Sequence, residues 1–335
     1  MSDLSAVLER LIGGETLSAT EAEALFGRIM AGQVAPEMIA GLLVALRVRG
    51  ETAAEVAGAA RAMRAAATPV DAPEGAVDIV GTGGDGQHTY NASTAAAIAL
   101  SAAGVPVVKH GNRSVSSKAG SADVLEALGV PIDLDAQAAA DAACEYGFAF
   151  LFAPNFHPAM RYAIGPRRAL GVRTIFNLLG PLTNPAAVPN IVLGVFGPQW
   201  LEPVAEALRE LGIRRAMVVH AQDPLDEISL SAPTDLIEVI DGTLCRDQIA
   251  PSDFGLRRVS LGVLRGGDAA HNAAAIERAF SGDFEELAAW IALNAAAGLR
   301  VARDLDWQEA IGQMREVIDS GRARDQLERL RGLQA

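Results

Sequence analysis

Residues 76–86 have the sequence Ala-Val-Asp-Ile-Val-Gly-Thr-Gly-Gly-Asp-Gly, and this stretch decides the fold class. A short β-rich run (76–80) leads directly into a segment with four glycines in six residues (81–86). Glycine adopts positive φ at little steric cost and lets backbone amides approach an anion closely. The stretch therefore predicts a strand followed by an anion-binding loop, with a glycine-rich turn of no chemical role as the alternative.

Further β-rich runs follow, and helical stretches separate them. The runs lie at 105–110, 148–153, 191–196 and 215–221, with helices expected from Ser93 and from Ser121. This alternation predicts a mostly parallel central sheet flanked by helices. Residues 234–247 indicate a hairpin around Asp241-Gly242, and the chain is expected to be helical again from about Asp268.

The first 70 residues are predicted to form a small all-helical domain. Apolar residues recur at helical spacing at Ile39, Leu42, Leu43 and Leu46. Two capping boxes are expected, Thr20 with Glu23 and Thr52 with Glu55. Residues 68–75 are rich in turn formers and predict a linker. We therefore expect a helical N-terminal domain (1–70) and a large α/β domain (76–335).

The composition narrows the possible partners. The chain has 335 residues and a net charge of −13, which disfavours general binding of nucleic acid or of an anionic membrane. A polyanionic ligand then needs a local positive site or a metal ion. The two cysteines, Cys144 and Cys245, are too few for a disulfide framework and fit a reducing cytoplasm. We expect no signal peptide and no membrane span.

Polar residues cluster after the predicted strands. Asn91, Ser93 and Thr94 begin a helix, whose N-terminus favours anions. The segment 109–121 carries three cations with interleaved serines and glycines, which is typical of a phosphate cradle, although a solvated loop is the alternative. Ligands of open α/β sheets bind at this edge, beyond the carboxyl ends of the strands.

Two further candidates are an acidic pair and an arginine. Asp226 and Glu227 follow a strand and are suitable oxygen ligands for Mg²⁺, although such pairs are often surface turns. Arg167 is a candidate for pairing with a substrate carboxylate, or an ordinary surface arginine of a helix.

The string 81–86 also matches the dinucleotide-binding pattern, but two features oppose that interpretation. The helix is expected to open only after Asn91, and the next strand ends in Lys109-His110 where an acidic ribose ligand is expected.

Five longer strings together resemble the anthranilate phosphoribosyltransferase family of tryptophan biosynthesis. They are GTGGDG (81–86), NAST (91–94), KHGNRSVSSKAGSADVLEALG (109–129), HPAMRYAIGPRRALGVRTIFNLLGPLTNP (157–185) and DPLDEISL (223–230). The resemblance extends over nearly the whole chain. His271, where Glu is expected, and Tyr90, where Phe is expected, are the departures.

The resemblance implies transfer of the phosphoribosyl group of 5-phosphoribosyl 1-diphosphate (PRPP) to the amine of anthranilate, with Mg²⁺. It implies PRPP contacts at Gly81, Gly84, Asp85, Thr89, Asn91, Ala92, Ser93, Thr94, Lys109, His110, Gly111, Asn112, Arg113, Ser114, Val115, Ser116, Ser117 and Ser121. It implies anthranilate contacts at Gly81, Asn112 and Arg167, and metal ligands Ser93, Asp226 and Glu227. Lys109 and His110 are expected to act electrostatically, with no acid–base or nucleophilic residue. A homodimer through the helical domain, which segment 163–183 is expected to join, is also implied.

Two alternatives remain open. A pyrimidine nucleoside phosphorylase shares the glycine-rich string more loosely, but it needs no acidic metal pair. A non-catalytic relative that binds nucleic acid should have a basic face, which the charge of −13 disfavours.

Overall fold

The computed structural model describes residues 3–114 and 118–333. Four helices form its N-terminal part: α1 (Leu4–Ile12), α2 (Ala19–Met30), α3 (Pro36–Arg49) and α4 (Ala53–Ala65). The strands are β1 (Val77–Gly81), β2 (Val107–Gly111), β3 (Phe148–Phe152), β4 (Asn190–Gly194), β5 (Arg215–Ala221), β6 (Thr234–Ile240) and β7 (Thr243–Ile249). The remaining helices are α5 (Ala92–Ala102), α6 (Ser121–Ala127), α7 (Ala136–Glu145), α8 (Ala153–Phe156), α9 (Arg161–Leu170), α10 (Phe176–Leu182), α11 (Leu201–Glu210), α12 (Ala269–Phe280), α13 (Glu285–Arg303), α14 (Trp307–Asp319) and α15 (Arg322–Arg331).

The predicted fold class is confirmed. One seven-stranded sheet has the order β3-β2-β1-β4-β5-β6-β7, with β1 to β5 parallel and the hairpin β6–β7 antiparallel at one edge. Asp241 and Gly242 both have positive φ, as a two-residue hairpin turn requires. The strand order reverses between β1 and β4, where Gly81 is paired with Gly194. In open α/β sheets such a switch point is where ligands bind.

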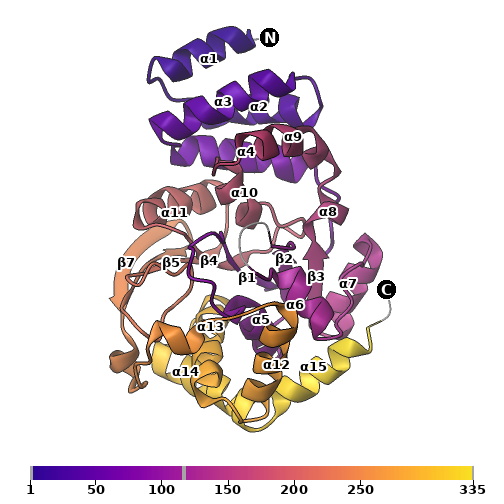
Figure 1. The fold of residues 1–335 in the computed structure, drawn as a ribbon, viewed down its shortest axis with the longest axis vertical. Coiled ribbons are helices and arrows are strands. Elements are labelled where there is room, and N and C mark those ends of the chain that lie inside the picture. The colour runs from indigo at the N-terminus through magenta and orange to yellow at the C-terminus, as the bar shows by residue number, and fades with distance from the viewer. Residues whose placement is uncertain (1–2, 115–117, 334–335) are drawn as a thin grey trace.

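Two buried cores lie on the two faces of the sheet. Side chains of β1 and β5 such as Ile79 and Met217 point into the core shared with α5, α6, α7 and α12 to α15. Alternate side chains such as Ile191 and Val218 point into the core shared with α11, α10 and α1 to α4. Figure 1 shows the helical bundle at one end of the molecule and α12 to α15 at the other.

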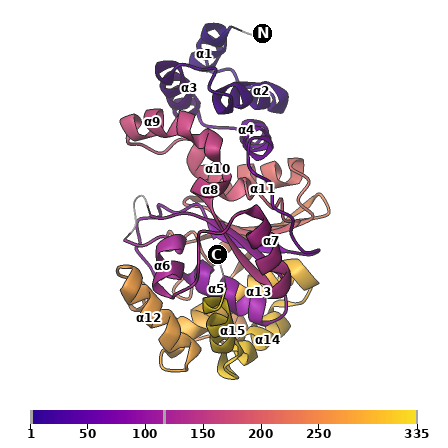
Figure 2. The ribbon, with the colours of Figure 1, turned by 90° about the vertical axis from the view of Figure 1, so that its right-hand side faces the viewer.

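Segment 163–183 lies against the N-terminal helices. Helix α9 packs on α3 and α2, and α10 packs on α4. The ring of Phe176 meets that of Phe26 edge-on, with centroids 5.7 Å apart. Figure 2 shows α9 beside α3 and away from the sheet. The boundaries 1–70 and 76–335 stay a prediction, because the bundle shares one continuous core with a face of the sheet.

One of the two expected helix caps is wrong. The box of Thr52 and Glu55 is present, but α2 is capped by Ser18 with Glu21 and not by Thr20 with Glu23. Both pairs fit the same spacing, and Leu17, directly before the Ser18 cap, is buried and donates its amide to Glu55 Oε1 at 2.8 Å. None of the helices in the described part of the chain is long and apolar enough to cross a membrane.

Candidate active site at the carboxyl ends of the strands

The glycine-rich loop follows β1 and curls over the switch point. Gly83, Gly84 and Gly86 have φ of 68°, 76° and 79°, a region that disfavours side chains. The Thr82 hydroxyl accepts a hydrogen bond from the Phe196 amide at 3.0 Å, which ties the loop to the end of β4. A local sequence of glycines thus forms a turn whose position is fixed by a neighbouring strand.

Asp226 lies directly over the switch point. A Cβ atom at Gly81 or at Gly194 would overlap atoms of Asp226, so both glycines are needed for this approach. The Asp226 carboxylate accepts from the Gly83 amide at 2.6 Å. Burial, with Asp85 nearby, raises the pKa of Asp226 to about 7. A cation at this point would relieve that cost of burying negative charge.

Glu227 reaches the N-terminus of α5. Its Oε1 accepts from the Ser93 amide at 3.0 Å, whereas its Oε2 is buried with no hydrogen-bond partner among the described atoms. Burial, followed by repulsion from Asp226, raises the pKa of Glu227 well above its usual range. The acid pair therefore joins the glycine loop to the N-terminus of α5.

Lys109 brings positive charge to the same place. The residue is 1% exposed, and Nζ donates to the Ile79 carbonyl and to Ser93 Oγ, the latter at 3.4 Å. Burial lowers the pKa of Lys109, and the nearby acids Asp78, Glu227 and Asp226 oppose that shift. A buried ammonium surrounded by three carboxyl groups is well placed to balance their charge.

Asp78 is a buried acid of this cluster that the sequence did not indicate as a site residue. Its Oδ2 accepts from Asn184 Nδ2 at 2.9 Å and from the His110 amide at 3.3 Å. Burial raises its pKa to about 6, while Lys109 opposes the shift. The available signal was a lone acid inside the apolar run 76–80. Asp78 and Asn184 hold the end of β2, and thereby Lys109, in place.

His110 differs from the expected electrostatic role. Its Nδ1 lies 3.1 Å from the Gly180 carbonyl, which only accepts, so Nδ1 carries the proton. Burial, with His157 5.0 Å away between ring centroids, lowers its pKa to about 3. The ring is therefore neutral at pH 7 and brings no positive charge.

The segment after β2 folds back onto the start of α6. Asp123 accepts from the amides of Gly120 and Ser114 at 2.8 and 3.0 Å. Arg113 forms ion pairs with Asp123 and Glu126, so its guanidinium is already paired within the protein. Ser121 Oγ donates to the Asn112 carbonyl at 3.3 Å. The predicted contacts Val115, Ser116 and Ser117 lie outside the described residues.

Residues 89–94 connect the site to α12. Thr89 forms an antiparallel bridge with Arg265. Asn91 donates to the Ala119 carbonyl at 3.2 Å and accepts from Asn272 at 2.8 Å, which joins this segment to the loop before α6. The sequence therefore predicted correctly that the segments after β1, β2 and β5 converge at one edge of the sheet.

Arg167 lies apart from this cluster, on α9. Its guanidinium is over the ring of Phe176, 5.1 Å from the centroid, and burial lowers its pKa. No described contact joins Arg167 to Asn112 or to Gly81, the other two expected anthranilate contacts.

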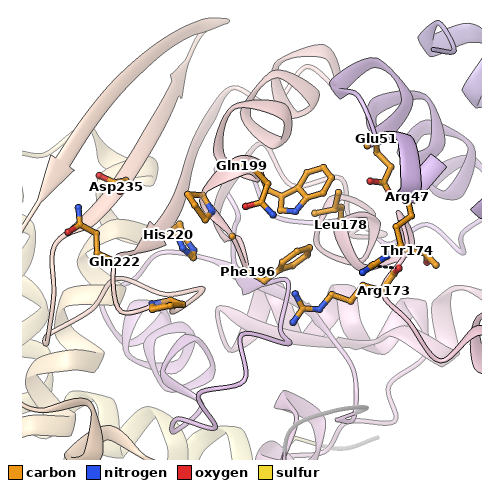
Figure 3. A pocket seen from close by; sticks show the side chains of 15 residues that line it. Arg47, Glu51, Arg173, Thr174, Leu178, Phe196, Gln199, His220, Gln222 and Asp235 are labelled. Carbon is orange, nitrogen blue, oxygen red and sulfur yellow. Dashed lines mark hydrogen bonds between the residues drawn. The ribbon is translucent and has the colours of Figure 1, made fainter. Parts of the chain in front are cut away.

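A large cavity lies beside the cluster and between the bundle and the sheet. It has a volume of about 690 Å³ and is lined by residues including Arg47, Arg173, Phe196, Trp200 and His220. Figure 3 shows Arg47 on α3, Arg173 in the segment before α10, and Phe196 and His220 near the ends of β4 and β5. Trp200 follows β4 in the chain and lies just before α11. The described residues contain no group of three or more His, Cys, Asp or Glu side chains arranged to hold a metal ion.

Comparison with known proteins decides the family. The model described as "Glycosyl transferase family, a/b domain" matches residues 73–324, and "Glycosyl transferase family, helical bundle domain" matches residues 5–67. A relative from Rhizobium meliloti (strain 1021) named anthranilate phosphoribosyltransferase is 49% identical, with 98% of each chain covered. The chain belongs to the anthranilate phosphoribosyltransferase family.

Solved structures of anthranilate phosphoribosyltransferases agree in fold. The enzyme of Thermus thermophilus has a TM-score of 0.91 at 46% identity, covering 97% of this chain and 98% of that one. The enzyme of Saccharomyces cerevisiae in complex with PRPP and Mg has a TM-score of 0.89 at 29% identity, covering 98% and 96%.

The two departures from the anthranilate phosphoribosyltransferase pattern contact each other. The Tyr90 hydroxyl lies 3.2 Å from His271 Nε2, and the two rings stack with centroids 5.7 Å apart. The hydroxyl of Tyr90 thus has a partner that phenylalanine would not need, so the two unexpected residues form one local unit.

Proposed function

We propose that this protein transfers the phosphoribosyl group of PRPP to the amine of anthranilate, and releases diphosphate, in tryptophan biosynthesis. The observation that carries the proposal is the convergence of the glycine loop, the α5 N-terminus, Lys109 and the acid pair at the β1/β4 switch point. Amides, one buried ammonium and two carboxylates match a diphosphate bound together with a divalent cation.

The donor is proposed to bind along this edge of the sheet. We propose the PRPP contacts that the family resemblance implies, which lie after β1, at the N-terminus of α5 and after β2. The expected contribution of one of them, Arg113, is different. Arg113 is expected to contribute less than Lys109, because Asp123 and Glu126 already pair with it at 2.9 and 2.8 Å. Main-chain amides and Lys109 then provide most of the attraction for the phosphates.

Magnesium is proposed to bind through Ser93, Asp226 and Glu227. The residues fit, because Glu227 Oε2 lacks a partner among the described atoms and both acids have raised pKa values. Two carboxylates and one hydroxyl suit Mg²⁺, which takes its other ligands from water and substrate phosphates. When bound, the ion supplies charge neutralisation for the departing diphosphate.

The chain's own residues account for the remaining chemistry. Cleavage at ribose C1 leaves negative charge on the diphosphate, which Lys109 and the loop amides stabilise without reorganisation. The amine of anthranilate is neutral at pH 7, so no strong general base is required, and His110, whose pKa is lowered to about 3, is too weak a base to act as one. Arg167, Asn112 and the Gly81 backbone are proposed to hold anthranilate so that its amine faces C1.

The direct test follows the loss of anthranilate fluorescence after addition of PRPP. We expect turnover with Mg²⁺, little without it, and no release of thymine from thymidine and phosphate. The double variant Asp226→Asn, Glu227→Gln should lose most turnover and shift its Mg²⁺ dependence to higher concentrations. The control Glu316→Gln, Asp319→Asn removes two exposed acids of α14 and should behave as the wild type. Thymine release by the wild type would reject the proposal.

We propose further that the protein is a homodimer that assembles through its helical part and functions in the cytoplasm. Exposed apolar side chains gather on this part, at Ile12, Val44, Val48, Ile164 and Val172. They belong to α1, α3, α9 and the residues just after α9. Val48→Asp should convert the dimer to a monomer in light-scattering measurements.

Cys144 and Cys245 are both exposed and unpaired, as a reducing compartment allows.

A further inference from the structure

Arg173 contacts the glycine loop, although it lies far from that loop in the sequence. It belongs to the segment between α9 and α10, and its Nη2 donates to the Gly84 carbonyl. The guanidinium lies over the ring of Phe196, 4.4 Å from the centroid. A Cβ atom at Gly84 would be 3.2 Å from Arg173 Nη2 and 3.5 Å from Cζ, so the guanidinium lies against the Gly84 backbone.

This contact fixes the direction of a peptide group. Gly84 has a φ of 76°, and glycine in a flexible turn can rotate its peptide planes at little cost. In a planar trans peptide, the carbonyl oxygen of one residue and the amide hydrogen of the next point in opposite directions. With the Gly84 carbonyl held on Arg173, the Asp85 amide points away from Arg173. Such oriented amides are what a glycine loop uses to bind phosphate.

The helical bundle holds Arg173 from the other side. Arg47, near the end of α3, donates through Nη1 to the main-chain carbonyl of Arg173. Figure 3 shows Arg47 and Arg173 next to each other, with Phe196 beside Arg173. A continuous series of contacts therefore leads from α3 through Arg173 to the Gly84 carbonyl. Sequence spacing gave no sign of it, because the three residues are 37 or more positions apart.

We propose that Arg173 is a positioning residue that holds the Gly84–Asp85 peptide in its phosphate-binding orientation, with Arg47 supporting it from the helical bundle. The inference rests on the proposed function, since it assigns a role in binding PRPP. It adds to the loop a side chain from the segment that packs on the bundle. It also predicts that the bundle influences donor affinity without touching the donor.

The first experiment compares Arg173→Ala with Arg329→Ala. Arg329 is a matched control, because it is also exposed, lies 5.7 Å from the Tyr146 ring centroid and donates to the Glu145 carbonyl, but on α15. We expect the Kd for PRPP with Mg²⁺ to rise about tenfold in Arg173→Ala, as for a lost hydrogen bond from a charged donor. The KM for anthranilate should stay near the wild-type value, and Arg173→Lys should recover part of the affinity.

Hydrogen exchange measured without any ligand separates positioning from direct phosphate contact. In Arg173→Ala, amides of residues 82–88 should exchange about tenfold faster than in the wild type, because the loop is released. Exchange in Arg329→Ala should be unchanged there. Unchanged loop exchange in Arg173→Ala, or equal losses for PRPP and anthranilate, would overturn the inference.

A double-mutant cycle tests the support from α3. Arg47→Ala alone should weaken PRPP binding by about threefold, and the effect in an Arg173→Ala background should be smaller, since both act through one contact series. Fully additive effects would overturn the role of Arg47. Turnover by the wild type is measured in parallel, and its absence would reject the proposed function. If the wild type turns over and the variants bind PRPP as tightly as the wild type does, only the inference is rejected.

Discussion

Replacing Gly120 with alanine should push the segment 112–114, part of the proposed donor site, away from α6. We expect this displacement to be large enough to reduce catalysis strongly. Gly120 is the N-cap of α6, with φ of −90° and ψ of 176°, so alanine fits the backbone conformation itself. A Cβ there would lie 2.5 Å from the Ser114 amide nitrogen, 2.6 Å from the Asn112 carbonyl oxygen and 2.7 Å from the Arg113 carbonyl carbon. All three are main-chain atoms, so no side chain can rotate away.

The size of the effect follows from these distances. Ordinary contacts of a Cβ begin near 3.4 Å, so the segment 112–114 and α6 must separate by roughly 1 Å. Asp123 holds both partners, through the amides of Gly120 and Ser114, and resists that movement. A displacement of about 1 Å in a positioned site costs about 100-fold in rate, and overpacking costs about 1–3 kcal/mol of stability.

The assay measures kcat/KM from anthranilate fluorescence, with the free energy of unfolding from urea titration. Gly312→Ala is the control, because a Cβ at Gly312, in α14, meets nothing within 4 Å. The control should keep full activity and gain up to about 1 kcal/mol in stability, since alanine is the better helix former. A kcat/KM for Gly120→Ala equal to that of the control would refute the reasoning, because the loop would then not need its present position.

Three further predictions follow from the buried charges and from Arg167. Lys109→Met should lower the free energy of unfolding by about 3–5 kcal/mol in urea titration, because it leaves buried carboxylates uncompensated. In steady-state kinetics it should raise the KM for PRPP more than the KM for anthranilate. An unchanged free energy of unfolding would contradict the proposed charge balance. Arg167→Ala should raise the KM for anthranilate about tenfold more than the KM for PRPP. Equal changes in the two KM values would indicate that Arg167 has a structural role and does not bind anthranilate. Burial raises the pKa of Asp78 to about 6, above its usual 3.8, so this carboxyl stabilises the fold below about pH 4 and that contribution is lost as the pH rises to about 6. Relative to Asp78→Asn, the wild type should lose about 3 kcal/mol of unfolding free energy between pH 4 and 7, and parallel pH profiles would contradict the raised pKa.

Local signals predicted most of the elements. The alternation of β-rich and helical runs, the Asp241-Gly242 turn and the Thr52 cap each depend on residues close together in the chain, and each was found. The capping box at Thr20 failed for a local reason. Ser18 and Glu21 satisfy the same spacing two residues earlier, and the buried Leu17 beside them is tied to Glu55 of α4, a contact that spacing along the chain does not reveal.

The sequence indicated residues that the structure brings together at the sheet edge, but it did not indicate their electrostatic states. The sequence indicated Lys109, His110 and the acid pair by type and position after a strand. It did not indicate that burial leaves His110 neutral or raises the pKa of Asp226 to about 7. Such shifts depend on how much protein surrounds a group and on which charges approach it from elsewhere in the chain.

The sequence by itself determined the order of helices and strands, the glycine-rich turn after β1 and the chemical types available at the sheet edge. Those features depend on backbone preferences and on the period of apolar residues, which neighbours along the chain set. Only the tertiary structure decided that Glu227 caps α5, that Asn184 supports Asp78 and that Arg173 holds Gly84. Each joins residues at least 89 positions apart, and hydrogen bonds of that kind exist only once the sheet has brought their strand ends together.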